Sequence, residues 1–192
     1  EWVVDQALNQ IKLWIEDGLE IKVSVNVSTR NLIDKSFVPY LQERLEYYQV
    51  PPHLLEVEIT ESALMADPEH ALDTLNKVHD LGVQISVDDF GTGYSSLVYL
   101  RQLPLDTLKV DIMFVRNMCH SKQDSIIVNS IINLAHNLAL TVVAEGAEDV
   151  DTVNALKEMS CDQVQGFYFS KPLTQDAFTS YCKDWQSEHS NL

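Results

Sequence analysis

The chain has 192 residues, 45% of them hydrophobic, and its 29 acids against 13 basic residues give a formal net charge of −16. This charge argues against nucleic-acid polymers and anionic membrane surfaces as partners, because both are bound by clusters of Lys and Arg. The hydrophobic content is ordinary for a folded protein with a buried core, which argues against a disordered chain.

In the first half of the chain, apolar side chains alternate between helical and strand spacing. Residues 2 to 18 have helical spacing, and Gly18 is a stop signal. The segment "IKVSVNVS" (21 to 28) alternates strictly and predicts a strand. Further elements are predicted as a helix over 37 to 49, a strand over 54 to 60, a helix over 68 to 81 and a strand over 83 to 89. Pro68 suits the first turn of the third helix, and Gly82 follows its end.

The second half of the chain continues this alternation. Helices are predicted over 95 to 103, 126 to 138, 149 to 159 and 174 to 185, and strands over 107 to 111, 141 to 146 and 162 to 169. Six predicted strands separated by helices, without a linker rich in Pro, Gly or Ser, indicate one α/β domain with parallel strands. Both a doubly wound sheet and a (β/α) barrel have this order of elements.

The polar residues of the strands distinguish these two folds. Side chains alternate between the two faces of a strand. In each predicted strand, the polar or charged side chains fall on one of these faces. A doubly wound sheet has helices on both faces, so these polar faces favour a TIM-type (β/α) barrel, whose inward faces converge. The polar residues at or near the carboxyl ends of the strands are Asn26, Glu58, Asp88, Lys109, Glu145 and Gln165.

Two adjacent carboxylates, Asp88 and Asp89, begin the stretch "DDFGTGYSS", and their mutual repulsion predicts a cation beside them. The candidate metal ligands are Asn26, Glu58, Asp88, Asp89 and Glu145. Oxygen donors alone suit Mg²⁺ or Mn²⁺, and the absence of paired His or Cys disfavours zinc. Two such ions about 4 Å apart are a common device for hydrolysing a phosphodiester, and Lys109 is a candidate for holding the water or a phosphate oxygen.

Other interpretations of the same residues stay open. A single acid at a strand end is more often a solvated or capping residue, and only its repetition on six strands favours a site. Lys109 is also a candidate Schiff-base lysine, but that role needs a lowered pKa, which nearby acids oppose. The stretch "FGTGYSS" (90 to 96) is either a phosphate cradle or a shaped loop that packs against a neighbouring loop or subunit; it lacks the Lys of a P-loop.

The remaining reactive residues predict no further site. Cys119, Cys161 and Cys182 lack C-x-x-C spacing, which argues against disulfides and thiolate metal sites and favours a reducing cytoplasm. The histidines have no ligand spacing and are interpreted as structural. No apolar run approaches the ~20 residues of a membrane span, so no direct membrane contact is expected, while an anchor upstream in a parent protein is left open.

With these residues assembled, the chain resembles the EAL domain family, bacterial phosphodiesterases that linearise cyclic di-GMP to pGpG. The matching segments, in family order, are "VSVNVSTR", "LEVEITES", "DDFGTGYSSL", "LPLDTLKVD", "VVAEGAED" and "CDQVQGFYFSKP". The resemblance implies a TIM-type barrel, a two-metal site with Mg²⁺ or Mn²⁺, and a place in second-messenger signal transduction. It also implies a homodimer formed through the loop after Asp89 and the neighbouring helix.

The resemblance assigns a role to each site residue. The metal ligands are Asn26, Glu58 and Asp88 for the first ion and Asp88, Asp89 and Glu145 for the second. The expected catalytic residues are Lys109, Glu145 and Glu61. Of these, Lys109 contacts the water and Glu61 anchors the "DDFGTGYSS" loop. The positions expected near the substrate are Asp111, Glu148 and Gln165.

Part of the family pattern is absent from the chain. The Glu-Ala-Leu motif and its substrate-contacting Arg belong before Glu1, and six strands do not close an eight-stranded barrel. We therefore expect residues 1 to 192 to be an N-terminally truncated EAL-type phosphodiesterase domain that does not turn over substrate alone. The alternative function is a catalytically inactive cyclic di-GMP receptor. The segments "KVDIMFV" and "AEGAED" differ from the common family pattern but keep its charged ligands.

Overall fold

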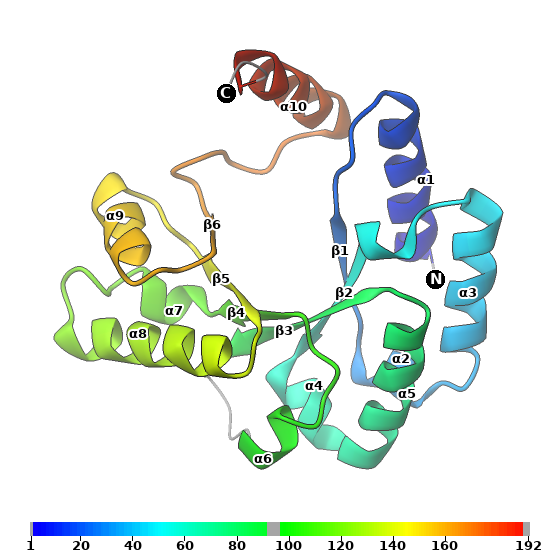
Figure 1. Ribbon diagram of the computed structural model, residues 1–192, viewed down its shortest axis with the longest axis horizontal. Helices are drawn as coiled ribbons and strands as arrows, with labels where there is room; N and C mark the ends of the chain where they lie inside the picture. The colour runs from blue at the N-terminus through cyan, green and yellow to red at the C-terminus, as the bar shows by residue number, and fades with distance from the viewer. Residues whose placement is uncertain (1, 92–96, 190–192) are drawn as a thin grey trace.

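Six parallel strands form a half-barrel within residues 2–91 and 97–189, the part of the chain that the computed structural model describes (Figure 1). The strands follow the chain order across the sheet, and each pairs with the next in parallel. They are β1 Val23–Asn26, β2 Leu55–Thr60, β3 Gln84–Phe90, β4 Thr107–Val110, β5 Thr141–Glu145 and β6 Gln163–Gln165. The predicted incomplete (β/α) barrel is confirmed, and every strand overlaps its predicted segment.

The helices lie on the outer side of the half-barrel (Figure 1). They are α1 Trp2–Glu16, α2 Thr29–Ile33, α3 Phe37–Tyr48, η1 Pro52–Leu54, α4 Glu61–Ala66, α5 Pro68–Asp80, α6 Leu97–Leu100, α7 Ile112–Val115, α8 Lys122–Asn137, α9 Val150–Glu158 and α10 Gln175–His189. Within the described ranges, no helix has both the length and the apolar character needed to cross a bilayer.

Side-chain caps explain the helix starts that apolar periodicity does not predict. The short helices α2, α4 and α7 follow Ser28, Thr60 and Asp111, whose side chains each accept a backbone N–H of the first turn. Helix α8 begins earlier than predicted because Ser121 Oγ accepts the Asp124 N–H at 3.2 Å. These caps place polar side chains directly after the strands, where a barrel has its mouth.

Strand β6 is shorter than the predicted strand over 162 to 169. The chain turns after Gln165 and lies against the loop that follows β5. A Cβ on Gly166 would be 2.0 Å from the carbonyl oxygen of Ala147, so only glycine fits this approach. The Tyr168 N–H then donates to the same carbonyl at 3.1 Å, which ends the extended conformation.

The core lies between the sheet and the helices. Outward side chains of β2, β3 and β4 that are at most 1% exposed are Leu55, Val57, Ile59, Ile85, Val87, Leu108 and Val110. Burial of each contributes roughly 1.5–3 kcal/mol. The inward faces are polar: Glu58 and Lys109 on the central strands are buried, whereas Asn26 and Gln165 on the edge strands are exposed.

Helix α10 packs against the carboxyl-terminal end of α1, so the first and last helices of the described chain are in contact (Figure 1). The indole N–H of Trp14 donates to Thr179 Oγ1 at 2.8 Å, and the Trp14 ring lies 5.4 Å from the Phe178 ring, centroid to centroid. Lys183 and Asp17 form an exposed ion pair at 2.8 Å. These contacts fix α10 beside the β1 edge of the half-barrel.

Aspartates in two loops fix the starts of the strands that carry the later site residues. Asp106 Oδ2 accepts the Ile85 N–H at 2.8 Å, and Asp162 Oδ2 accepts the Val142 N–H at the same distance. Ile85 and Val142 are fully buried, so no solvent replaces these acceptors. Each aspartate therefore ties the loop before one strand to the start of the preceding strand.

Asp106→Ala is expected to lower the free energy of unfolding by about 1–3 kcal/mol, because the buried Ile85 N–H loses its acceptor. Urea unfolding followed by circular dichroism measures the loss. As a control, Asp73→Ala removes an exposed ion pair with Lys77 on α5 and should cost less than about 1 kcal/mol. Equal losses in the two variants would contradict the role given to Asp106.

Candidate functional site

A buried lysine lies at the meeting point of three carboxylates near the carboxyl ends of the central strands. Lys109 Nζ is 2.6 Å from Glu145 Oε1, 3.0 Å from Glu58 Oε1 and 3.4 Å from Asp88 Oδ1. Lys109 is 6% exposed and Glu58 8% exposed. The structure thus brings four of the predicted site residues into direct contact, one from each of β2, β3, β4 and β5.

Strand alternation and register produce this convergence. Lys109 lies between Leu108 and Val110, which are fully buried on the opposite face, so its side chain points inward. In the parallel register, Asn26 of β1 is opposite Glu58 of β2. Side chains at the ends of neighbouring parallel strands therefore meet at one rim of the sheet.

The carboxylates keep Lys109 charged. Burial alone would lower the pKa of Lys109, but the hydrogen bond and charge of Glu145, and then those of Glu58, raise it above its ordinary value of 10.5. A Schiff-base lysine needs a lowered pKa, so this environment disfavours that alternative. Burial also raises the pKa of Glu145, an effect that Lys109 opposes and that the charges of Asp88 and Glu58 reinforce.

Asp89 lies beside this cluster in an unusual backbone conformation. Its φ of 56° is in the left-handed region, which Asp tolerates better than most residues, and its N–H donates to Asp88 Oδ1 at 3.0 Å. Burial, the charge of Asp88 and a hydrogen bond with Asp111 raise the pKa of Asp89. Asp111 also caps α7 by accepting the Met113 N–H at 2.6 Å. The second aspartate of the pair is therefore linked to the loop after β4.

The other predicted residues lie around this centre. Glu61 is 2% exposed, and its Oε2 accepts the Gly91 N–H at 3.1 Å, which ties the start of α4 to the end of β3. Glu148 pairs with Arg116 at 2.5 Å, and both are about half exposed. Asn26 and Gln165 are exposed on the two edge strands. Among the described residues, neither edge side chain forms a hydrogen bond or ion pair with the Lys109 cluster, although Asn26 is opposite Glu58 and Gln165 is opposite Glu145 in the sheet register.

The donor set fits hard divalent cations, but the carboxylates are gathered around an ammonium group. All the candidate ligands offer oxygen, which Mg²⁺ and Mn²⁺ prefer. Over residues 2–91 and 97–189, no group of three or more His, Cys, Asp or Glu residues has the geometry of a metal site. Lys109 Nζ takes the central position instead, so binding of divalent ions requires the carboxylates to turn away from the lysine.

The predictions for the "FGTGYSS" segment fall largely on residues 92–96, which lie outside the described residues. The same holds for the loop that the predicted homodimer would use. Only its first part is described: Gly91 has φ 99°, and a Cβ there would lie 3.0 Å from the Phe114 ring and 3.2 Å from Ile131 Cδ1. Gly91 therefore lies close to α7 and α8.

Two features of the site are not predicted by the sequence. Arg116, the partner of Glu148, is 32 positions away in the chain, and no local pattern links the two residues. Glu56 lies on the inward face of β2 and is 4% exposed, so strand alternation indicates its direction but not its partners. Such pairings depend on the tertiary structure.

The family model described as "EAL domain" matches residues 1–172. The chain is 39% identical over 187 residues to the cyclic di-GMP phosphodiesterase NbdA of Pseudomonas aeruginosa, an alignment that covers 97% of this chain and 24% of that protein. The solved PaMucR phosphodiesterase, in complex with c-di-GMP, has a TM-score of 0.89 and 36% identity, covering 92% of this chain and 72% of that one. The EAL domain of Mycobacterium smegmatis DcpA has a TM-score of 0.90 and 36% identity, covering 94% of this chain and 81% of that one.

The chain spans about a quarter of the length of the curated relatives that it matches first. It spans most of the two solved structures. The similarity therefore covers one domain of those larger proteins.

Lys109→Met is expected to destabilise the fold by about 3–5 kcal/mol at pH 7.5, because the converging carboxylates lose their cation. Without the lysine, the already raised pKa of Glu145 rises further. The folded state then takes up a proton at a higher pH than the unfolded chain, so the penalty shrinks as the pH falls toward the ordinary Glu value of 4.5.

Thermal unfolding at pH 7.5 and 5.5 measures this dependence, with Lys183→Met as the control because its ion pair with Asp17 is half exposed. The melting temperature of the Lys109 variant, relative to the unaltered chain, should be lower at pH 7.5 than at pH 5.5. If the Lys109 variant lost the same number of degrees in melting temperature at both pH values, the proposed carboxylate repulsion would be contradicted.

Proposed function

Because this chain belongs to the EAL domain family, we propose that it supplies most of the active site of a metal-dependent phosphodiesterase that opens cyclic di-GMP to linear pGpG. The convergence of Glu58, Asp88 and Glu145 on Lys109 carries this proposal. It lies at the carboxyl ends of the strands, where (β/α) barrels place their chemistry. Matched relatives named as cyclic di-GMP phosphodiesterases support the substrate.

We assign two divalent ions, Mg²⁺ or Mn²⁺, to the oxygen donors of this rim. The proposed ligands are Asn26, Glu58 and Asp88 for the first ion and Asp88, Asp89 and Glu145 for the second. When bound, the ions would polarise the phosphodiester and offset the negative charge that develops on it. Asn26 lies opposite Glu58 in the register of β1 and β2, which supports their assignment to the same ion.

Lys109 is the proposed catalytic cation. Its raised pKa keeps it protonated, so it donates a hydrogen bond to the attacking water or to a phosphate oxygen. Its ion pair with Glu145, 2.6 Å long in this structure, opens when Glu145 turns toward the second proposed ion. In the hydrolysis, a P–O bond to water forms and the P–O bond to the ribose 3′ oxygen breaks, and that oxygen leaves as a hydroxyl after taking up a proton.

The remaining predicted residues position the loops and the substrate. Glu61 anchors the end of β3, the strand that carries Asp89, through its bond to the Gly91 N–H. Asp111, Glu148 and Gln165 are proposed substrate contacts. Asp111 is hydrogen-bonded to Asp89, and Gln165 is opposite Glu145 in the sheet register, so both lie at the same rim as the proposed ions.

We further propose that residues 1–192 are part of an EAL-type domain whose barrel is closed by strands outside this chain. The exposed inward side chains of β1 and β6 support this, as does an apolar pocket of about 400 Å³ between β6 and α10, lined by Val164, Phe178 and Tyr181. A homodimer through the loop after Asp89 remains part of the proposal. The unpaired cysteines are consistent with action in the cytoplasm.

A second candidate function is a cyclic di-GMP receptor without turnover. The central position of Lys109 Nζ among the carboxylates favours it, because an ammonium group there competes with divalent ions. The two functions differ in one observable. A receptor retains the nucleotide unchanged, whereas the phosphodiesterase releases pGpG.

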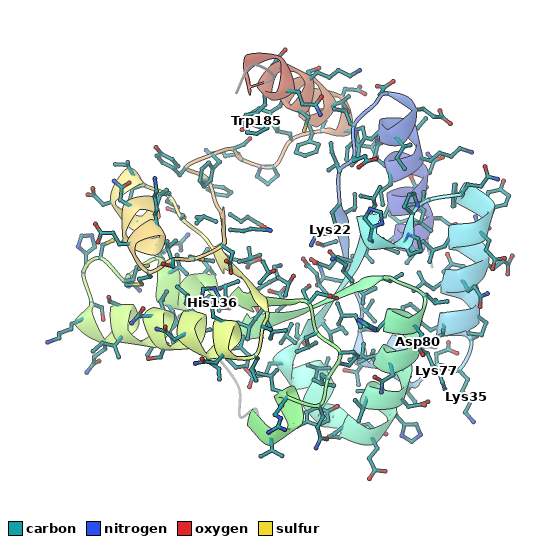
Figure 2. All side chains as sticks on the ribbon, viewed as in Figure 1. Lys22, Lys35, Lys77, Asp80, His136 and Trp185 are labelled. Carbon is teal, nitrogen blue, oxygen red and sulfur yellow. The ribbon has the colours of Figure 1, made fainter. Side chains whose placement is uncertain are left out.

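In the full-length protein, Asp88→Asn is expected to lower cyclic di-GMP hydrolysis by about 100-fold or more, because one carboxylate shared by both proposed ions is lost. Separation of the nucleotides after incubation with Mn²⁺ measures the product. Asp80→Asn is the control. Asp80 is the last residue of α5 and comes before the start of β3, whereas the rim lies at the carboxyl ends of the strands (Figure 2). A folded full-length protein that binds cyclic di-GMP but makes no pGpG would overturn the enzymatic proposal in favour of the receptor.

A further inference from the structure

A second ion pair, in which only the carboxylate is buried, lies inside the half-barrel and has no part in the proposed reaction. Glu56 on β2 is 4% exposed, and its Oε2 is 2.6 Å from Lys22 Nζ, just before β1. Glu56 Oε1 accepts the Ser24 hydroxyl at 2.8 Å, and Thr107 Oγ1 of β4 donates to Oε2 at 3.4 Å. Figure 2 shows Lys22 on the inner side of β1. One carboxylate thus joins three strands.

Members of this cluster lie two positions before residues of the proposed active site. The pairs are Ser24 and Asn26, Glu56 and Glu58, and Thr107 and Lys109. Side chains two positions apart in a strand point to the same face. The Glu56 cluster therefore forms the layer of the interior directly beneath the rim, on the same strands.

Strand β1 depends on this layer more than the central strands do. It has four residues, and among the described strands it pairs only with β2. Lys22 and Ser24 both bond to Glu56, so two side chains of the β1 segment are fixed to one residue of β2. This attachment adds to the backbone pairing that places Asn26 opposite Glu58.

Glu56 also joins β2 to β4 by a side-chain hydrogen bond that passes over β3. Ser86 occupies the intervening strand and is fully buried, but in the described part of the chain its Oγ has no hydrogen-bond partner. Ser86 is opposite both Glu58 and Thr107 in the sheet register. The long Glu56 side chain instead reaches Thr107 directly and links the two strands that carry Glu58 and Lys109.

We propose that Glu56 and Lys22 are positioning residues of the active site, which hold Asn26 against Glu58 and so set the affinity of the first metal position. This inference rests on the proposed function, because it takes Asn26 and Glu58 as ligands of one ion. The second position, formed by Asp88, Asp89 and Glu145, lies on strands that Lys22 and Ser24 do not touch. Loss of the ion pair therefore weakens one of two metal positions.

Titration of the full-length protein with Mn²⁺, followed by electron paramagnetic resonance of the free ion, tests this role. The unaltered chain is expected to bind two ions. Glu56→Gln and Lys22→Met should each raise the dissociation constant of one of them about tenfold and leave the other within about twofold. Lys22→Arg keeps the cation and should restore the affinity. Because the Lys22 side chain is 34% exposed, its variants are expected to fold even if the Glu56 variant does not.

A matched ion pair on the outer surface provides the control. Asp5 of α1 pairs with Arg44 of α3 at 2.5 Å and accepts the Tyr40 hydroxyl at 2.9 Å, so it also combines a cationic partner with a hydroxyl partner. Asp5→Asn should lower the melting temperature without changing either Mn²⁺ dissociation constant. This separates a position-specific effect from a general loss of stability.

Each other outcome contradicts a defined part of the account. Unchanged Mn²⁺ binding in the folded Lys22→Met variant, or equal weakening of both ions, would overturn the positioning role and leave the proposed function intact. If Asp5→Asn weakened Mn²⁺ binding as much as Lys22→Met does, the positioning role would be overturned as well. An unaltered chain that binds no Mn²⁺ would overturn the metal site of the proposed function, and the positioning role with it.

Discussion

The electrostatic requirement to keep several carboxylates together in a buried position governs the site of this protein. Glu58, Asp88 and Glu145 reach the same rim from three strands, and Lys109 contacts all three. One ammonium group does not balance three carboxylates, so the rim keeps an excess of negative charge in a poorly solvated place. That excess is the physical reason to expect divalent cations there, and it also explains the raised pKa of Lys109.

The outward face of the sheet stabilises the fold, and the inward face carries the residues of the proposed site. Outward residues such as Val57, Ile85 and Leu108 are fully or almost fully buried beneath the helices and supply the hydrophobic stabilisation. The inward face carries two polar layers, the Glu56 cluster below and the Lys109 cluster at the rim. Because each layer is held by direct side-chain bonds between strands, the register of the sheet and the geometry of the site depend on the same contacts.

Much of this organisation could be predicted from the sequence because it follows from short periodicities. Alternation within strands placed Glu58, Asp88, Lys109 and Glu145 on one face, and the order of elements indicated parallel strands, which together give the half-barrel. Periodicity did not predict the short helices α2, α4 and α7, which begin at single capping side chains. Nor did it predict the early end of β6, which is set by the packing of Gly166 on Ala147, or ion pairs between distant residues such as Lys22 and Glu56.

The central claim is that the oxygen donors of this rim hold divalent ions that replace the lysine at their centre. A crystal structure of the domain grown with Mn²⁺, with the ions located by anomalous scattering, measures this directly. Two Mn²⁺ ions about 4 Å apart are expected, coordinated by Asp88 together with Glu58 and Glu145, with Lys109 Nζ moved out of the carboxylate cluster. Lys109 still bonded to all three carboxylates, with no anomalous peak within coordination distance of them, would contradict the central claim.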